Sequence, residues 1–351
     1  ATGFAAAVDL STLDGSNGFR LDGIEILDFS GVSVASAGDV NGDGFADILI
    51  GAYGGDSVGG ADAGQTFVLF GQASGFAAAL DLSTLDGVNG FRVDGIDASD
   101  ESGFSVASAG DFNGDGFDDI LIGARGADPG GDAYAGESYV VFGQASGFAA
   151  AFDLSTLDGN NGFRLDGVAA LDASGHSVSA AGDVNGDGFA DIMIGAYGGD
   201  PGGNSYAGES YVVFGSRPGE AVSRTGTAIA NRINGGDFGD TLNGLGGDDT
   251  LIGWDGIDTL NGGTGADDMS GGDNNDTYVV DEAGDVVTEA ADEGSDTVQS
   301  GLSFSIAALA NLENITLIGT AANATGNTGA NTLVGNDEAN ILDGGGGADD
   351  M

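Results

Sequence analysis

An acidic nine-residue segment occurs three times in this chain at a constant separation. It reads Asp-Val-Asn-Gly-Asp-Gly-Phe-Ala-Asp from Asp39, changes at two positions in the copy from Asp111, and returns unchanged from Asp183. Successive copies therefore start 72 residues apart. A fixed period indicates a repeat architecture, in which each repeat is one supersecondary unit that buries its apolar faces against its neighbours. This repeat limits the possible folds more than any other feature of the sequence.

Each acidic segment carries oxygen-bearing side chains at positions 1, 3, 5 and 9, and a phenylalanine carbonyl at position 7 could complete the set. Gly42 and Gly44 permit the sharp turn that would bring these oxygens inward. Such an oxygen-rich loop suits a hard cation such as Ca²⁺. An EF-hand would need a bidentate Glu at position 12, where the first copy has Ile50, so that motif is rejected. A solvated acidic turn is the simpler alternative, which three near-identical copies disfavour.

Four short β-type segments are expected in each 72-residue unit, because β-branched and aromatic residues cluster between glycines. In the second unit they span residues 91–94, 104–109, 119–124 and 138–142. The third segment is apolar on both faces and is therefore expected to be buried on both sides. Four-stranded antiparallel blades stacked as in a propeller would bury it, although three blades are too few to close a ring.

These units resemble FG-GAP repeats, the blades of integrin-α-type propellers. The resemblance rests on Phe70-Gly71, Gly51-Ala52 and the acidic segment. The proline usual after Gly-Ala is replaced by Tyr53, Arg125 and Tyr197. The resemblance covers residues 1–216 and implies three calcium sites. Their ligands would be Asp39, Asn41, Asp43, Phe45 and Asp47; Asp111, Asn113, Asp115, Phe117 and Asp119; and Asp183, Asn185, Asp187, Phe189 and Asp191.

The period changes to nine residues after Gly235. The aspartates that keep this period are Asp240, Asp249, Asp258, Asp267 and Asp276. An apolar residue follows two positions after each, as in the Gly-Gly-x-Gly-x-Asp-x-apolar-x pattern of a parallel β-roll. Two nonapeptides would form one coil, with glycine turns binding calcium and short strands pointing their apolar side chains inward. Residues 280–318 are expected to extend this coil without metal.

This segment resembles the RTX, or haemolysin-type, calcium-binding β-roll. The turns depart from the pattern at the second glycine (Leu245 and Trp254) and at the fourth (Phe238 and Asn274), and weaker binding is expected there. A second block from Gly326 has Asn331 and Asn340 where aspartate is expected, followed by Asp349, which we include among the ligands. Because asparagine lacks the charge, the second block should bind more weakly.

Composition excludes several classes of function. The formal net charge is −49, which would repel nucleic acid and anionic lipid, and bound cations would neutralise it. The chain has no cysteine and no apolar run long enough to span a membrane, so we expect neither disulfides nor membrane insertion. The single histidine, His176, aligns with Val32 and Phe104 and is assigned a packing role. Arg20, Arg92 and Arg164 recur at one position and are expected to form structural salt bridges.

The expected architecture is all-β, with antiparallel propeller-like blades in residues 1–218 (units 1–72, 73–144 and 145–218), a linker at 219–234 and a β-roll at 235–351. Both ends interrupt a repeat, so the chain is interpreted as part of a longer polypeptide. No catalytic constellation is found, and an enzyme is not expected.

The resemblances imply a secreted bacterial protein, exported by type I machinery and stiffened by several Ca²⁺ ions. We expect a structural or adhesive role at the cell surface, with self-association or cell-surface ligands as partners. The alternative is a non-catalytic accessory region of a larger secreted enzyme or toxin.

Overall fold

The computed structural model describes residues 7–351, so the first six positions of the first predicted unit lie outside the described residues. The chain divides into two compact units, one that runs through Phe112 and resumes over Phe117–Phe214, and one formed by Asn113–Gly116 and Gly215–Met351. The fold is all-β, as predicted. Among the described residues, no helix has the length and apolar character needed to cross a membrane.

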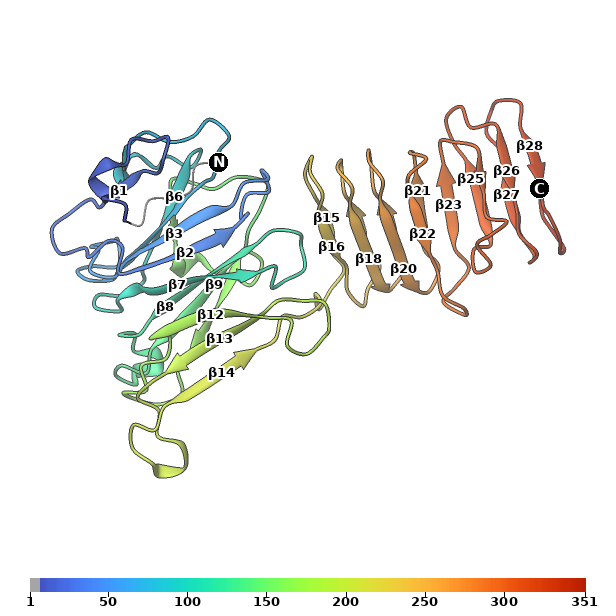
Figure 1. Cartoon of the computed structure of the whole chain (residues 1–351). Helices are drawn as coiled ribbons and strands as arrows, with labels where there is room; N and C mark the ends of the chain where they lie inside the picture. Colours follow the sequence, from blue (N-terminus) through green and yellow to red (C-terminus); the bar gives the residue numbers. More distant parts are fainter. Residues whose placement is uncertain (1–6) are drawn as a thin grey trace. The chain divides into compact units, whose positions relative to one another are not determined.

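The first unit contains three sheets that are antiparallel except at one edge strand (Figure 1). Their strand orders are β10-β6-β4-β3-β2, β11-β9-β8-β7 and β12-β13-β14, and a separate parallel pair joins β1 and β5. The strands are β1 Arg20–Asp22, β2 Ser33–Gly38, β3 Asp47–Ala52, β4 Gln65–Leu69, β5 Ala79–Asp81, β6 Gly90–Asp94, β7 Ser102–Gly110, β8 Asp119–Ala124, β9 Glu137–Val141, β10 Ala151–Asp153, β11 Gly162–Asp166, β12 Ser177–Gly182, β13 Asp191–Ala196 and β14 Glu209–Val213. Five short 3-10 turns lie at Leu10–Thr12, Leu82–Thr84, Pro129–Gly131, Leu154–Thr156 and Pro201–Gly203.

The sheets are offset by one strand from the sequence repeat. The segment predicted as the first strand of the second unit, β6, pairs antiparallel with β4 and so belongs to the first sheet. In the same way β11, from the third unit, completes the second sheet by pairing with β9. The predicted grouping of four strands within one repeat unit was therefore wrong. A period fixes the length of a repeat but not the residue at which a sheet begins.

The central strand β8 is buried on both faces, which confirms the prediction made for it. Ile120 and Ile122 face one apolar cluster, and Leu121 faces another that also contains Ile192 and Ile194 of β13. Alternate side chains of a strand point to opposite faces, so a strand packed between two neighbouring sheets must be apolar throughout. The predicted salt bridges are also present, with Arg20, Arg92 and Arg164 each bonded to the aspartate two positions later.

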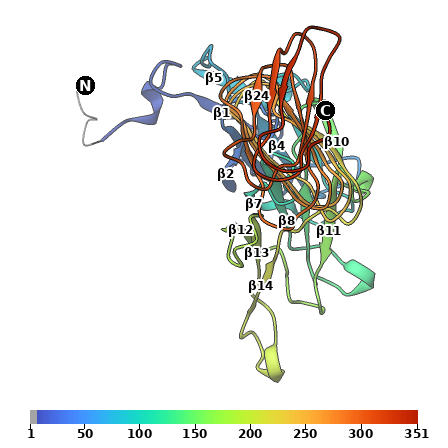
Figure 2. The same cartoon turned by 90° about the vertical axis from the view of Figure 1, so that its right-hand side faces the viewer.

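The second unit is a parallel β-solenoid whose coils stack in succession (Figure 1; Figure 2 views them nearly along the stacking axis). One sheet has the order β15-β17-β19-β21-β23-β25-β27; the opposing strands form β16-β18-β20-β22 and then β24-β26-β28. The strands are β15 Ser223–Thr225, β16 Arg232–Asn234, β17 Thr241–Asn243, β18 Thr250–Asp255, β19 Thr259–Asn261, β20 Asp268–Asp273, β21 Thr277–Val280, β22 Val286–Thr288, β23 Thr297–Ser300, β24 Phe304–Ser305, β25 Asn314–Leu317, β26 Asn323–Thr325, β27 Thr332–Val334 and β28 Ile341–Asp343.

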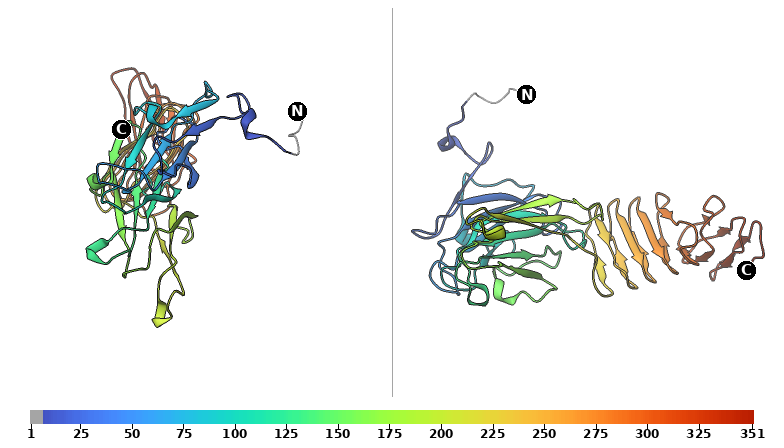
Figure 3. Two further views of the ribbon diagram at one scale, coloured as in Figure 1. Left: turned by 90° about the vertical axis from the view of Figure 1, so that its left-hand side faces the viewer. Right: turned by 90° about the horizontal axis from the view of Figure 1, so that it is seen from below.

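The strand register confirms that two nonapeptides make one coil. Thr241 pairs with Thr259 and Thr259 with Thr277, so each step along the sheet spans two nonapeptides. The next coil is longer, because Thr277 pairs with Thr297 rather than with Ser295. Residues 280–318 continue the parallel coil, as predicted (Figure 3). The solenoid begins earlier than expected, since β15 and β16 lie within the predicted linker at 219–234.

The solenoid core is a column of apolar side chains, as the nonapeptide pattern predicts. The residue two positions after each periodic aspartate is buried, and these residues are Leu242, Leu251, Leu260, Met269 and Tyr278. Because each coil alone cannot enclose such a side chain, neighbouring coils must stack to bury it.

Candidate metal sites and an aromatic pocket

The first acidic loop folds around its own side chains. Asp39 accepts hydrogen bonds from the backbone N–H groups of Asp43 (3.0 Å) and Gly44 (2.8 Å), and Asn41 Oδ1 accepts a second one from Asp43 N–H (3.0 Å). Gly42 and Gly44 have φ of 69° and 88°, the left-handed region that the turn was predicted to need. The third loop repeats these bonds through Asp183, Asn185 and Asp187.

The aspartate at position 9 ties each loop to the sheet. Asp47 is 1% exposed, and its two oxygens accept backbone N–H groups of Val40 (2.9 Å) and Gly71 (2.8 Å). Asp119 makes the matching bonds to Phe112 and Gly143. Burial raises the pKa of Asp47 to about 7. Since Gly71 and Gly143 end the Phe-Gly motif, this carboxylate explains why that motif recurs with the loop.

Local hydrogen bonds thus gather the predicted ligands of the first and third loops, at the end of the sheet where the central strand begins. Asn113 and Asp115 of the second loop are joined in the same way, through Asp115 N–H to Asn113 Oδ1 (2.8 Å). Asp111, Phe117 and Asp119 occupy the corresponding positions. The grouping predicted from spacing fits the structure, and the calcium-binding role of these side chains remains a prediction.

In the solenoid, the periodic aspartates form a ladder from coil to coil. The backbone N–H of one aspartate donates to Oδ1 of the corresponding aspartate in the next coil: Asp240 to Asp258 (2.7 Å), Asp249 to Asp267 (2.8 Å) and Asp258 to Asp276 (2.8 Å). All five side chains are buried. The sequence pattern therefore places each carboxylate between two successive coils, as expected.

The second oxygen of most of these carboxylates has no hydrogen-bond partner. Oδ2 is buried and unpaired in Asp249, Asp258, Asp267 and Asp276. The surroundings of Gly244 show what the unpaired oxygen of Asp249 faces. A Cβ added to Gly244 would collide with Asp249 Oδ2 and would also lie 2.5 Å from the carbonyl oxygen of Gly262. A carboxylate and a carbonyl thus approach one point with no donor between them. Buried acceptors without a donor are unfavourable, and a cation is the group that such a site fits.

The electrostatics of the ladder agree with this interpretation. Burial raises the pKa of Asp249 to about 6 and the pKa values of Asp258 and Asp276 to about 7. Burial also raises the pKa of Asp267. Without a bound cation, these carboxyl groups hold protons at a higher pH than an exposed aspartate does, because a buried charge has lost its hydration.

The asparagine positions of the second block are satisfied within the chain. Asn331 Nδ2 donates to the carbonyl of Glu313 (3.1 Å), and Asn340 Nδ2 donates to the carbonyl of Ala321 (3.0 Å). In both residues the amide oxygen accepts the backbone N–H four positions earlier, from Asn327 and from Asn336 (2.8 Å each), so neither side chain presents the unpaired oxygen found in the aspartates. This contrast agrees with the expectation that the second block is the poorer cation binder. Asp349 keeps the ladder bond, from Asn331 N–H (3.1 Å).

Three of the four departures from the glycine pattern keep the left-handed turn geometry, and Phe238 does not. Leu245, Trp254 and Asn274 have φ of 72°, 77° and 85°, in the left-handed region that glycine normally supplies. Such a backbone costs a non-glycine residue of the order of 1 kcal/mol. The turns are therefore formed at these positions, at the expense of local strain.

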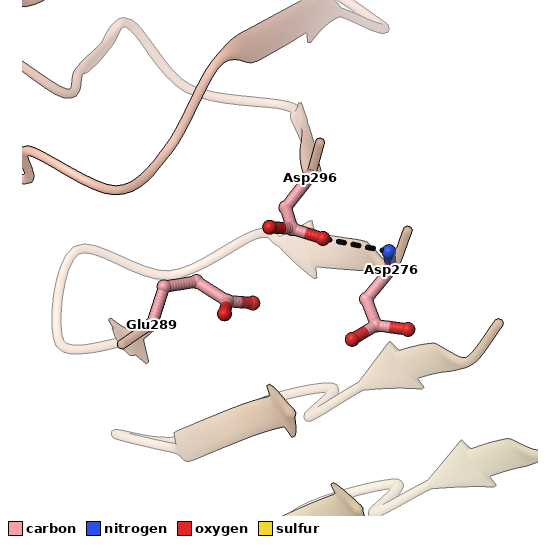
Figure 4. Close-up of side chains that lie close together, drawn as sticks. All are labelled: Asp276, Glu289 and Asp296. Carbon is pink, nitrogen blue, oxygen red and sulfur yellow. Dashed lines mark hydrogen bonds between the residues drawn. The ribbon is translucent and has the colours of Figure 1, made fainter. Parts of the chain in front are cut away.

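Sequence reasoning missed two acidic residues of the solenoid. Glu289 and Asp296 lie beside Asp276, and one carboxylate oxygen of each residue lies within 4.8 Å of the other two (Figure 4). Neither residue keeps the nine-residue period that identified Asp276. Periodicity alone could not have identified them.

A second kind of site lies at the opposite end of the first unit's sheets from the acidic loops. Aromatic rings there contact one another in a row. The ring centroids are 5.1 Å apart between Phe29 and Tyr53, 5.5 Å between Tyr53 and Phe104, 5.1 Å between Phe104 and His176, and 4.5 Å between His176 and Tyr197. The packing role predicted for His176 is thus confirmed. Burial, with a smaller effect of the Arg125 charge, lowers the pKa of His176.

A hollow of about 370 Å³ adjoins this aromatic row. The guanidinium carbon of Arg125 lies 3.5 Å from the centroid of Phe104, and this arginine pairs with Glu101 (Nε to Oε2, 2.6 Å). Exposed Tyr134 and Tyr206 complete the wall. Aromatic faces beside a cation and a carboxylate can bind a ligand that combines apolar and polar groups.

Comparison with known proteins identifies the first unit. The family model described as the FG-GAP repeat matches residues 30–69, 102–141 and 174–213. These matches cover β2–β4, β7–β9 and β12–β14, so they follow the sheets. The chain thus contains three FG-GAP repeats in a propeller-like arrangement of sheets. No RTX repeat family is shown for the solenoid.

Several relatives are integrin α chains. Integrin alpha-4 of Xenopus laevis is 28% identical over 180 residues (51% of this chain), and integrin alpha pat-2 of Caenorhabditis elegans is 34% identical over 173 residues (48%). Phosphatidylinositol-glycan-specific phospholipase D of Bos taurus is 29% identical over 161 residues (46%). The chain spans only 15%, 13% and 18% of these proteins' lengths. The repeats indicate an integrin-like domain of extracellular or adhesive type.

Proposed function

We propose that this chain is a calcium-dependent structural or adhesive region of a secreted bacterial protein. One observation carries the proposal: the row of buried, unpaired aspartate oxygens along the solenoid. Hard oxygen ligands in flexible loops suit Ca²⁺, and extracellular modules bind it with Kd of about 10⁻⁴–10⁻³ M. At free calcium about ten times Kd, each occupied site adds roughly 1.4 kcal/mol to folding stability.

Calcium binding would couple folding to the extracellular medium. In low calcium the net charge of −49 opposes compaction, and the second oxygens of the buried carboxylates have no donor. In millimolar calcium both penalties are relieved. The RTX-like repeats of the sequence further support export by a type I system, because a chain kept loose in the cytosol could cross unfolded.

The adhesive role is supported by the FG-GAP repeats, the integrin relatives and the aromatic hollow beside Arg125. Self-association is supported by β14. Within the described residues this strand pairs only with β13, and Phe214 beyond it is 53% exposed. The corresponding strands β4 and β9 each bond to a further strand on that side.

An accessory role in a secreted enzyme is a second candidate, favoured by the similarity to phosphatidylinositol-glycan-specific phospholipase D. Under this proposal the present chain is non-catalytic, and the active domain lies elsewhere in the polypeptide.

The test is a calcium titration of the chain, followed by circular dichroism and by negative-stain electron microscopy. We expect cooperative gain of β structure with calcium and its loss in chelator. Filaments or sheets that dissolve in chelator would support the structural role, whereas isolated particles would favour the accessory role. Identical folding and compactness in calcium and in chelator would refute the proposal.

A further inference from the structure

The acidic group formed by Asp276, Glu289 and Asp296 lies where the solenoid changes its construction. Glu289 directly follows β22, the last strand of the β16-β18-β20-β22 sheet. Asp276 and Asp296 directly precede β21 and β23, the two strands between which the coil becomes longer. Figure 4 shows the three side chains pointing toward one another from these strand ends.

Each of the three carboxylates has one oxygen held and one oxygen unpaired. Asp276 Oδ1 accepts from the N–H of Asp258 (2.8 Å), and Asp296 Oδ1 accepts from the N–H of Asp276 (2.8 Å). Glu289 Oε1 accepts the hydroxyl of Tyr278. The remaining oxygens, Asp276 Oδ2, Asp296 Oδ2 and Glu289 Oε2, are buried without any hydrogen-bond partner. The held oxygens orient the carboxylates, so the convergence is built into the fold.

This convergence is unfavourable unless a positive group occupies it. Asp276 and Asp296 are each 1% exposed, so water screens their mutual repulsion poorly. No ion pair found within residues 7–351 includes any of the three carboxylates.

We propose that Asp276, Glu289 and Asp296 together bind one Ca²⁺ ion that joins three strand ends of the solenoid. Two oxygens that each lie about 2.3–2.6 Å from one Ca²⁺ ion are at most about 5 Å apart, and each of the three carboxylates has one oxygen within 4.8 Å of an oxygen of the other two. The site differs from the glycine turns because three side chains supply its ligands, and it departs from the expectation that residues 280–318 hold no metal. It holds β21, β22 and β23 together where the regular nine-residue spacing of the aspartates ends.

This inference rests on the proposed function in one respect: the bound ion is taken to be Ca²⁺ because calcium-dependent folding is proposed for the chain. Glu289→Gln is the decisive variant, because Glu289 belongs to no nonapeptide turn and glutamine can still accept the Tyr278 hydroxyl. Glu282→Gln is the matched control, since Glu282 is exposed and has the same charge. Asp296→Asn supplies a second ligand variant that keeps the Oδ1 acceptor.

The experiment counts calcium ions bound per chain by equilibrium dialysis, with the fluorescence of Trp254 reporting that each variant is folded. Glu289→Gln and Asp296→Asn should each bind one ion fewer than the wild type, and the double variant should also bind only one fewer. Glu282→Gln should bind the wild-type number.

An unchanged number and affinity in Glu289→Gln would overturn the inference while leaving calcium-dependent folding intact. A double variant that lost two ions would also overturn it, because the two residues would then serve different ions. A wild-type chain that bound no calcium would refute both this inference and the proposed function.

Discussion

Replacing Asp258 with asparagine should change the stability of the solenoid in opposite directions with and without calcium. Asp258 Oδ1 holds the N–H of Asp240, and asparagine keeps that acceptor. Asp258 Oδ2 is buried and unpaired, and a Cβ added at Gly253 would lie 2.5 Å from the carbonyl of Gly271 and collide with this oxygen. An asparagine that kept Oδ1 as this acceptor would place its amide N–H where Oδ2 now lies, and there it could donate to the carbonyl of Gly271.

In chelator, Asp258→Asn should therefore stabilise the solenoid by about 1–3 kcal/mol, the usual penalty of a buried unpaired acceptor. In calcium at ten times Kd it should destabilise the solenoid by at least roughly 1.4 kcal/mol, because one site is lost. For a unit of this size each kcal/mol shifts Tm by about 4 °C. The two Tm shifts should have opposite signs and be several degrees each.

The assay is thermal unfolding at pH 8, followed by the fluorescence of Trp254. This residue is the single tryptophan of the chain and lies near the end of β18, four residues before Asp258, so the signal reports the solenoid alone. Asp337→Asn, an exposed aspartate, controls for the removal of one negative charge. Destabilisation of equal size in chelator and in calcium would refute the cation-site interpretation.

Three further changes follow from the same geometry. Without calcium, Tm should be higher at pH 5 than at pH 8: the raised pKa values of Asp258 and Asp276, about 7, mean that the folded state binds more protons than the unfolded state between about pH 4 and 7. Calcium affinity, by dialysis, should instead rise with pH, because ligands must be deprotonated; a flat profile would contradict both statements. Leu245→Gly should raise Tm by a few degrees, since φ of 72° strains leucine and its side chain is half exposed, and a lower Tm would show that no strain is stored there. Asn331→Asp should lower stability in chelator and add calcium-dependent stabilisation, whereas a calcium-independent loss would mean that the amide serves only the fold.

The repeats made most of the architecture predictable. The nine-residue period identified the parallel coil, its buried column from Leu242 to Tyr278 and the aspartates that join successive coils. The longer period of the first unit identified its strands and its acidic loops. In both regions a regular pattern in the sequence corresponds to a regular pattern of hydrogen bonds. The positions of these strands and loops could therefore be predicted from the repeat alone.

Features that depend on phase or on irregular spacing were not predictable. The pairing of β6 with β4 was missed because a period does not say which repeat donates a strand across the boundary. Glu289 and Asp296 were missed because their convergence on Asp276 depends on the longer coil between Thr277 and Thr297, which interrupts the period. The role of Asp47 in holding Gly71 was also missed, since it joins positions far apart in sequence through the folded sheet.

The aspartate ladder has a consequence for how the solenoid would respond to calcium. Each aspartate bonds through its side chain to one coil and through its N–H to the next, so the state of one site alters the position of ligands in its neighbour. Such a system behaves as a one-dimensional array with nearest-neighbour coupling. Its calcium titration should be steeper than that of independent sites, and the steepness should grow with the number of uninterrupted aspartate coils. Length of the repeat, rather than the affinity of any single turn, would then set the sharpness of the calcium threshold.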